Sequence, residues 1–247
     1  MNILITNDDG WGSQGILALI DIMRQLGHVT VLAPDGPRSG FSNAISTTRL
    51  MTLKKVIDPT REDVDIYVTN GTPSDCVKIA LNILFKGDES AIDLIASGIN
   101  HGSNASINAI YSGTIGACLI GAEHNIRAIG FSIYDNNAPT DLSHFLPYIK
   151  PLTEELLSRD WPAGMCYNIN APLGPIEGVQ WTRQSRGHWA DEIAPKGVAD
   201  DGSTLYGLVG YFVNDEPDAT DTDEYALHHA YISIQPCTPD MTFYPAL

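Results

Sequence analysis

Apolar positions in the first two thirds of the chain alternate between short runs and helical stripes. The short runs are rich in β-branched residues, which is typical of buried strands. The stripes repeat at helical spacing; in GILALIDIMRQLG, for example, Ile16, Leu19, Ile20 and Met23 share one face. The runs predict strands at residues 2–6, 28–34, 65–71, 92–100 and 127–134, and the stripes predict helices at 15–27, 72–85, 112–125 and 141–161.

Repeated strand–helix–strand units predict an α/β fold: a Rossmann-like, doubly wound, mostly parallel sheet with helices on both faces. Residues 46–64 are more polar and fit a β-hairpin excursion. The last third has short strands, glycines and prolines, and we expect VQWTRQ (179–184) and HHAYISIQP (228–236) to be antiparallel. We therefore expect one domain over 1–247, with an α/β core over about 1–160 and a β-rich extension over about 161–247 that pairs with another subunit.

The net charge of the chain limits the classes of molecule that it can bind. The net charge of −16 disfavours nucleic acid and anionic membrane surfaces. An anionic substrate would need a metal ion to invert the local sign. The chain shows no N-terminal signal and no apolar run long enough for a bilayer, so we expect a cytoplasmic protein. Its four cysteines form no CxxC pair and are expected to be reduced, buried thiols.

Candidate chemistry begins with Asp8 and Asp9, which directly follow the first strand. Ligands of open parallel sheets bind at the carboxyl ends of the strands, and the loops there are rich in Asp, Asn, Ser, Thr and Gly. Adjacent carboxylates with neutral oxygen donors suit Mg²⁺ or Mn²⁺. The alternative is that one aspartate caps the following helix or completes a turn.

Two further loops can hold a phosphate. YSGT opens a predicted helix, whose N-terminal amides attract anions, although Ser112 or Thr114 can equally be a plain cap. RSGFSN offers Ser39, Gly40, Ser42 and Asn43, and can equally be a solvated turn. Weaker candidates are Arg38 for the phosphate and His188, His228 and His229 for acid–base roles.

Five ordered blocks resemble one family. They are ILITNDDGWGSQGI, VLAPDGPRSGFSNAIS, NGTPSDCVKIAL, DLIASGINHGSN and YSGTIGACLIG, and the late TDTDEYALHHAYISIQP also fits. Together they are similar to the SurE family, the stationary-phase survival proteins, over nearly the whole chain. The match is loose over residues 184–215, and Ala230 stands where the family usually has glycine.

The resemblance implies a metal-dependent phosphatase that hydrolyses nucleoside monophosphates, a 5′-nucleotidase that can also take 3′-nucleotides. It implies a Rossmann-like core, and dimers or tetramers that exchange C-terminal elements. One divalent ion per subunit, Mg²⁺ or Mn²⁺, would be held by Asp8, Asp9, Ser39 and Asn100, and the two aspartates would also be catalytic. The residues expected around the phosphate are Gly40, Asn43, Asn104, Ser112, Gly113 and Thr114.

Two other functions compete with hydrolysis. A receiver-type switch also carries an acidic pair and Mg²⁺, but needs a phosphate-accepting aspartate at the end of the central strand. DIYVTNG ends instead in Thr69 and Asn70. A sugar-nucleotide transferase is suggested by GHVTVLAP, but such enzymes usually have two domains of this kind, and 247 residues is short for them.

Overall fold

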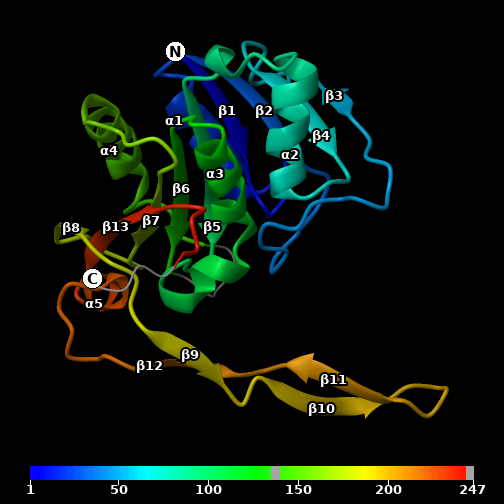
Figure 1. Cartoon of the computed structure of the whole chain (residues 1–247), viewed down its shortest axis with the longest axis vertical. Coiled ribbons are helices and arrows are strands. Elements are labelled where there is room, and N and C mark those ends of the chain that lie inside the picture. Colours follow the sequence, from blue (N-terminus) through cyan, green and yellow to red (C-terminus); the bar gives the residue numbers. More distant parts are fainter. Residues whose placement is uncertain (135–139, 243–247) are drawn as a thin grey trace.

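A nine-stranded sheet organises the molecule in the computed structural model, which describes residues 1–134 and 140–242 (Figure 1). The strand order is β3-β4-β2-β1-β5-β6-β7-β13-β8. The bounds are β1 Asn2–Thr6, β2 His28–Pro34, β3 Lys54–Val56, β4 Asp65–Thr69, β5 Leu94–His101, β6 Ala128–Ile133, β7 Cys166–Ala171, β8 Gly178–Trp181 and β13 Tyr231–Cys237. The central strands from β4 to β7 are all parallel, which confirms the Rossmann-like core.

Helices cover both faces of this sheet. Helices α1 (Gln14–Met23) and α4 (Leu146–Ser158) pack on one face, and α2 (Pro73–Ile79) and α3 (Gly113–Glu123) pack on the other (Figure 1). The described residues also form four shorter helices, η1 Ala80–Leu84, η2 Glu89–Ala91, η3 Ser106–Tyr111 and α5 Asp223–His228. Strand residues therefore face apolar side chains on both sides, which explains their continuous hydrophobic runs.

The last third differs from its prediction in two ways. Strand β8 pairs in parallel with β13, where we expected antiparallel neighbours, and β13 is antiparallel to β7 instead. Three strands from this region, β7, β8 and β13, extend the main sheet, so the expected division near residue 160 does not coincide with the edge of the sheet. The pair HH, expected at the start of the last strand, ends α5 instead. The excursion over 46–64 returns as β3, antiparallel to β4, as expected.

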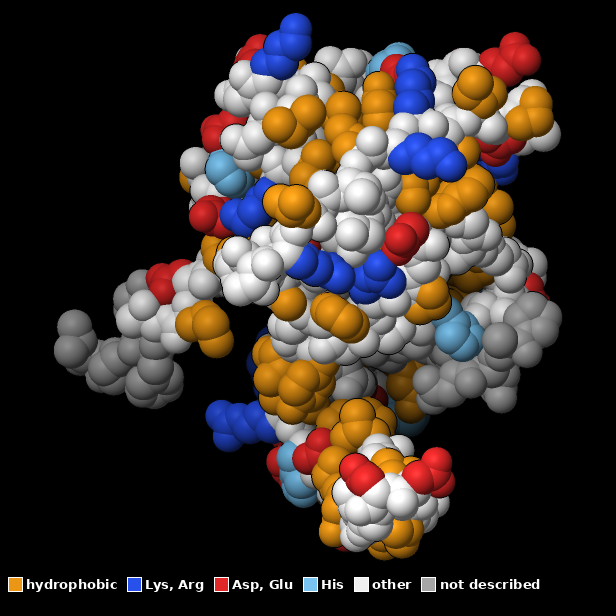
Figure 2. All heavy atoms as spheres, turned by 90° about the vertical axis from the view of Figure 1, so that its right-hand side faces the viewer, with side chains coloured by type: hydrophobic (Ala, Val, Ile, Leu, Met, Phe, Trp, Pro, Cys, Tyr) orange, Lys and Arg blue, Asp and Glu red, His pale blue; other side chains and the backbone are white. Residues whose placement is uncertain are grey.

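An arm projects from the body between β8 and α5 (Figure 1). It consists of two antiparallel pairs, β9 (Gly187–Ala190) with β12 (Tyr211–Asn214) and β10 (Ile193–Val198) with β11 (Thr204–Leu208). Its outer part carries exposed apolar side chains, among them Val198 at 68%, Tyr206 at 65% and Leu208 at 79% exposure. Figure 2 shows hydrophobic side chains gathered on this projection at the bottom of the view.

Candidate functional site

The NDDG turn after β1 is shaped by Asn7. Its side chain donates to the carbonyl of Gly10 at 3.0 Å and to the Ser13 hydroxyl at 2.9 Å, and accepts from the Gly10 amide at 3.2 Å. Gly10 has φ +98°, a conformation that glycine adopts without strain. The turn is thus built by its first and last residues, which leaves the two aspartates between them for other tasks.

Asp8, in the turn after β1, is buried against the first residues of α3, Gly113 and Thr114. The residue is 4% exposed, and its carboxylate accepts a hydrogen bond from Thr114 at 2.7 Å. Burial raises the pKa of Asp8 to about 6; the Thr114 hydroxyl opposes this rise and the charge of Asp9 adds to it. The pKa of Asp9 is also raised by burial, while the His101 amide, which donates to it at 3.3 Å, lowers it.

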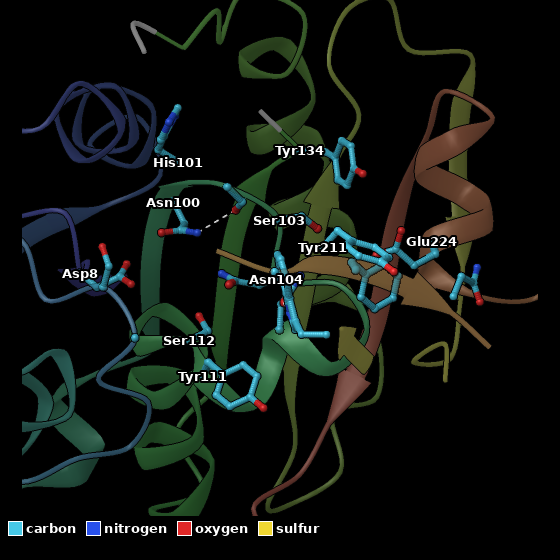
Figure 3. Close-up of a pocket in the computed structure, with 18 of the residues that line it drawn as sticks. Asp8, Asn100, His101, Ser103, Asn104, Tyr111, Ser112, Tyr134, Tyr211 and Glu224 are labelled. Atoms are coloured by element: carbon cyan, nitrogen blue, oxygen red, sulfur yellow. Dashed lines mark hydrogen bonds between the residues drawn. The ribbon is translucent and has the colours of Figure 1, made fainter. Parts of the chain in front are cut away.

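A polar cavity of about 690 Å³ opens beside Asp8. The loop after β2 contributes Ser39 and Gly40 to its lining, the end of β5 contributes Asn100, and Asn104 and Ser112 lie further along (Figure 3). The loops are tied together, because the Arg38 amide donates to the Asp8 carbonyl at 2.6 Å. The carboxyl ends of β1, β2 and β5 therefore do converge on one cavity.

Asn100 reaches this cavity through an irregular stretch of β5. The pairing of β5 with β6 shifts register between Ser97 and Asn100. Gly98 lies in this stretch at φ +128°, and a Cβ there would be 2.3 Å from the Phe131 carbonyl oxygen, so no larger residue fits. The Asn100 amide nitrogen donates to the Gly102 carbonyl at 2.7 Å, and its oxygen faces Asp8 (Figure 3).

Some predicted residues have other positions or partners. Asn43 does not line this cavity; it lies against Gly116 of α3, beside a separate hollow. Thr114 is fully buried and donates a hydrogen bond to Asp8, and Gly113 packs directly on Asp8. Ser112 lines the cavity and also caps α3 by accepting from the Ile115 amide at 3.1 Å.

Of the weaker candidates, some have partners outside the cavity and one lines it. The Arg38 guanidinium bonds Asp35 at 2.5 Å, and His188 pairs with Asp215 at 3.0 Å on the arm, outside the cavity. His229 stacks on Tyr225 with ring centroids 3.8 Å apart. His228 is the histidine of this group that lines the cavity.

Sequence reasoning missed a buried asparagine network behind the cavity. Asn170 accepts from the Asn104 amide at 2.8 Å and donates to Asn168 at 2.8 Å; Asn168 in turn donates to the Asn104 carbonyl at 2.9 Å. The Asn104 side chain then donates to the Ser132 hydroxyl at 2.8 Å. The signal was present in CYNINA, because polar residues at alternate positions of a buried strand share one face.

The far wall of the cavity was also missed. The arm provides Trp189, Tyr211 and Phe212, while Tyr134 follows β6 and Glu224 comes from α5. Figure 3 shows Tyr134, Tyr211 and Glu224 across the cavity from Asp8. These residues lie in or beside regions with weak patterning, so no periodicity pointed to them.

Because the carboxylate of Asp8 lies on this cavity, an anion would bind there only together with a cation. Among the residues that the structure describes, no three His, Cys, Asp or Glu side chains cluster where a metal ion could bind. A cation at Asp8 would therefore depend on one or two carboxylates completed by neutral oxygens. Ser39 and Asn100 are such neutral donors on the same cavity.

Comparison with known proteins places the chain in a family. The family model described as Survival protein SurE matches residues 3–191. A 5′-nucleotidase SurE from Phocaeicola vulgatus is 40% identical over 98% of this chain and 92% of its own length, and one from Flavobacterium psychrophilum is 40% identical over 99% and 94%. The crystal structure of the SurE protein from Aquifex aeolicus superposes with a TM-score of 0.81 at 26% identity, covering 98% of this chain and 95% of that one. The chain belongs to the SurE family.

Proposed function

We propose that this protein is a 5′-nucleotidase that hydrolyses nucleoside monophosphates to nucleoside and phosphate. The observation that carries the proposal is the buried Asp8 carboxylate, next to Asp9, on a polar cavity at the carboxyl end of the parallel sheet. Relatives named 5′-nucleotidase SurE support the same reading over nearly the whole chain. The receiver-type switch and the sugar-nucleotide transferase have no such support.

A divalent ion fits the residues present. Burial raises the pKa of both aspartates although each accepts a hydrogen bond, and a bound cation would favour their charged forms. The Asn100 amide is anchored through its nitrogen, which leaves its oxygen toward Asp8 (Figure 3). We propose one Mg²⁺ or Mn²⁺ ion, held by Asp8, Asp9, Ser39 and Asn100. Such an ion, when bound, polarises a phosphoryl group and lowers the pKa of water.

The chain itself positions the reacting groups. Thr114 fixes the Asp8 carboxylate, and Asp8 or Asp9 orients the attacking water and accepts its proton. Gly40, Asn104 and Ser112 line the cavity and are proposed to contact phosphate oxygens, with the N-terminus of α3 adding its dipole. Gly113 and Thr114, which contact Asp8, and Asn43, which lies beside α3, remain further candidates for the phosphate site.

The arm supports an assembly proposal. Leu208 is 79% exposed and Val198 is 68% exposed at its outer end, and exposed apolar side chains that gather on one surface mark an interaction site. We propose that a second copy of the chain covers this surface, in a homodimer or homotetramer that exchanges C-terminal elements. Light scattering after size-exclusion chromatography should show an oligomer, and Leu208→Asp should reduce its mass.

A cytoplasmic location is also part of the proposal. Cys76, Cys118 and Cys166 are free and buried, as the sequence predicted, and Cys237 is partly exposed. Free thiols fit a reducing compartment. Within the described residues, no helix is long and apolar enough to cross a membrane.

The test is a phosphate-release assay. The purified protein is given AMP, GMP, CMP, UMP or 3′-AMP with Mg²⁺ or Mn²⁺, and the same set is repeated with excess EDTA. We expect release from at least one 5′-monophosphate that requires the ion and is absent in Asp8→Asn. No release from any nucleotide with either ion would overturn the proposed function.

A further inference from the structure

Glu224 is a buried carboxylate that the proposed reaction does not use. It lies in the first turn of α5 and is 2% exposed, yet its Oε2 atom has no hydrogen-bond partner. The Nε2 atom of His228, which lines the same cavity, is 3.5 Å from Oε2. A buried carboxylate is normally satisfied by several donors, so a free oxygen here calls for a ligand.

The preceding residue provides an internal comparison. Asp223 is fully buried as well, but its Oδ1 accepts from the amides of Ser185 and Glu224 at 2.9 and 2.8 Å, and its Oδ2 accepts from the Ser106 amide at 2.8 Å. Asp223 therefore anchors α5 to the rest of the fold. Glu224 makes no such contact through Oε2, so its burial serves another purpose.

Glu224 faces the cavity that contains Asp8, on the opposite wall. Tyr134, Tyr211 and His228 line the cavity beside it, and Figure 3 shows the Glu224 carboxylate next to Tyr211, facing the cavity across from Asp8. The His228 ring meets the Tyr134 ring edge-on, with centroids 5.8 Å apart. Aromatic walls around one hydrogen-bond acceptor suit the flat, donor-bearing half of a nucleotide.

Asp8 and Glu224 lie on opposite sides of the cavity, so each would face a different half of a bound nucleotide. The Asp8 side carries the acidic and amide groups proposed for the phosphate, and the Glu224 side lies beyond Asn104. An acidic side chain repels phosphate, so Glu224 would disfavour binding in the reverse orientation. Its free oxygen would instead accept from a neutral hydroxyl or amino group.

We propose that Glu224 recognises the nucleoside half of the substrate, by accepting a hydrogen bond from a sugar hydroxyl or from an amino group of the base. The proposal rests on the proposed function and adds a specificity-determining residue to it. Glu224 does not touch the reacting phosphate. Its loss should therefore affect nucleotides and spare phosphate esters that have no nucleoside.

The experiment compares kcat/KM of wild type, Glu224→Gln and Glu224→Ala on AMP, 2′-deoxy-AMP, 3′-deoxy-AMP, IMP and p-nitrophenyl phosphate. The exposed Glu62→Gln, which removes the same charge, is the matched control. We expect the Glu224 variants to lose about 10- to 100-fold on AMP, as for a hydrogen bond to a charged group, and less than about twofold on p-nitrophenyl phosphate.

The substrate analogues identify the donor. Wild type should have a low kcat/KM on the analogue that lacks the group bonded to Glu224, and the Glu224 variants should have about the same kcat/KM as wild type on that analogue. The analogue is a deoxy-AMP if a sugar hydroxyl is bonded, and IMP if the amino group is. Nucleosides tested as inhibitors of p-nitrophenyl phosphate hydrolysis by wild type should rank in the same order, which gives a readout that needs no variant.

The outcomes separate the two proposals. Equal losses on AMP and p-nitrophenyl phosphate, or no loss on AMP, would overturn the role of Glu224 while leaving the nucleotidase intact. If wild type hydrolyses none of the nucleotides, the proposed function fails first, and the role of Glu224 fails with it.

Discussion

Neutralising Glu224 should stabilise the fold, and by an amount that depends on pH. Burial raises the pKa of its carboxyl from 4.5 to about 7, and the neighbouring charge of Asp223 adds to the rise. The carboxyl is 2% exposed, so little solvent screening applies. The folded state therefore holds this proton more tightly than the unfolded state does.

The sign and size follow from linkage. Below pH 4.5 the carboxyl is protonated in both states, and its stabilising contribution is fully present; it is lost as pH rises toward 7. The gap between 4.5 and about 7, at about 1.4 kcal/mol for each pH unit, corresponds to about 3 kcal/mol. Glu224→Gln removes this cost, so its free energy of unfolding should exceed that of wild type by up to about 3 kcal/mol above pH 7, and by almost nothing near pH 4.

Urea unfolding followed by circular dichroism between pH 4 and pH 8.5, in the presence of EDTA, measures the difference directly. The exposed Glu62→Gln should follow wild type throughout. The reasoning is refuted if Glu224→Gln is less stable than wild type at pH 8, or if its advantage is the same at every pH. Agreement would mean that this residue lowers stability at neutral pH, which is common for groups reserved for a ligand.

Other predictions concern the Asp8 side of the cavity. Asp8→Asn should reduce phosphate release on the order of 10³-fold or more while the circular dichroism spectrum stays that of wild type; residual activity near wild type would remove Asp8 from the mechanism. Thr114→Val should cost about 10- to 100-fold in kcat, because the Asp8 carboxylate loses its 2.7 Å hydrogen bond, and Thr114→Ser should restore most of it; equal activity of Val and Ser variants would contradict the positioning role. Asn170→Leu should lower the free energy of unfolding by about 2–4 kcal/mol in urea, since Asn104 and Asn168 each lose a buried partner, and a loss under 1 kcal/mol would show that the network relaxes. Dialysis against EDTA should abolish phosphate release, and added Mn²⁺ or Mg²⁺ should restore it; full activity after chelation would rule out the ion.

Much of the core was predictable because its signals are local. Buried strands such as NILIT and amphipathic helices such as residues 15–27 carry their patterns within a few turns. The topology rule for parallel sheets then brought the loops after β1, β2 and β5 to one edge, and the resemblance to the SurE family selected Asp8, Ser39 and Asn100 within them. The structure confirms that these three side chains line one cavity.

The rest depended on contacts that sequence spacing does not encode. Thr114 was expected at the phosphate, and its hydrogen bond to Asp8 comes from the close packing of α3 on the NDDG turn, which no spacing predicts. Asn43 follows Ser39 closely in sequence, yet the loop turns it onto Gly116. Glu224 and Tyr211 come from parts of the chain whose patterns are short, so only the folded arrangement brings them opposite Asp8.

The cavity has two walls of different origin, and this has an evolutionary consequence. The sheet edge that would carry the chemistry is formed before residue 115, while Trp189, Tyr211 and Phe212 sit on a ribbon that leaves and rejoins the body at its two ends. Under the proposed function, mutations in that ribbon would alter the surface that meets the leaving group without disturbing the groups that would cleave it. Selectivity for the leaving group would therefore be able to change separately from the hydrolytic residues.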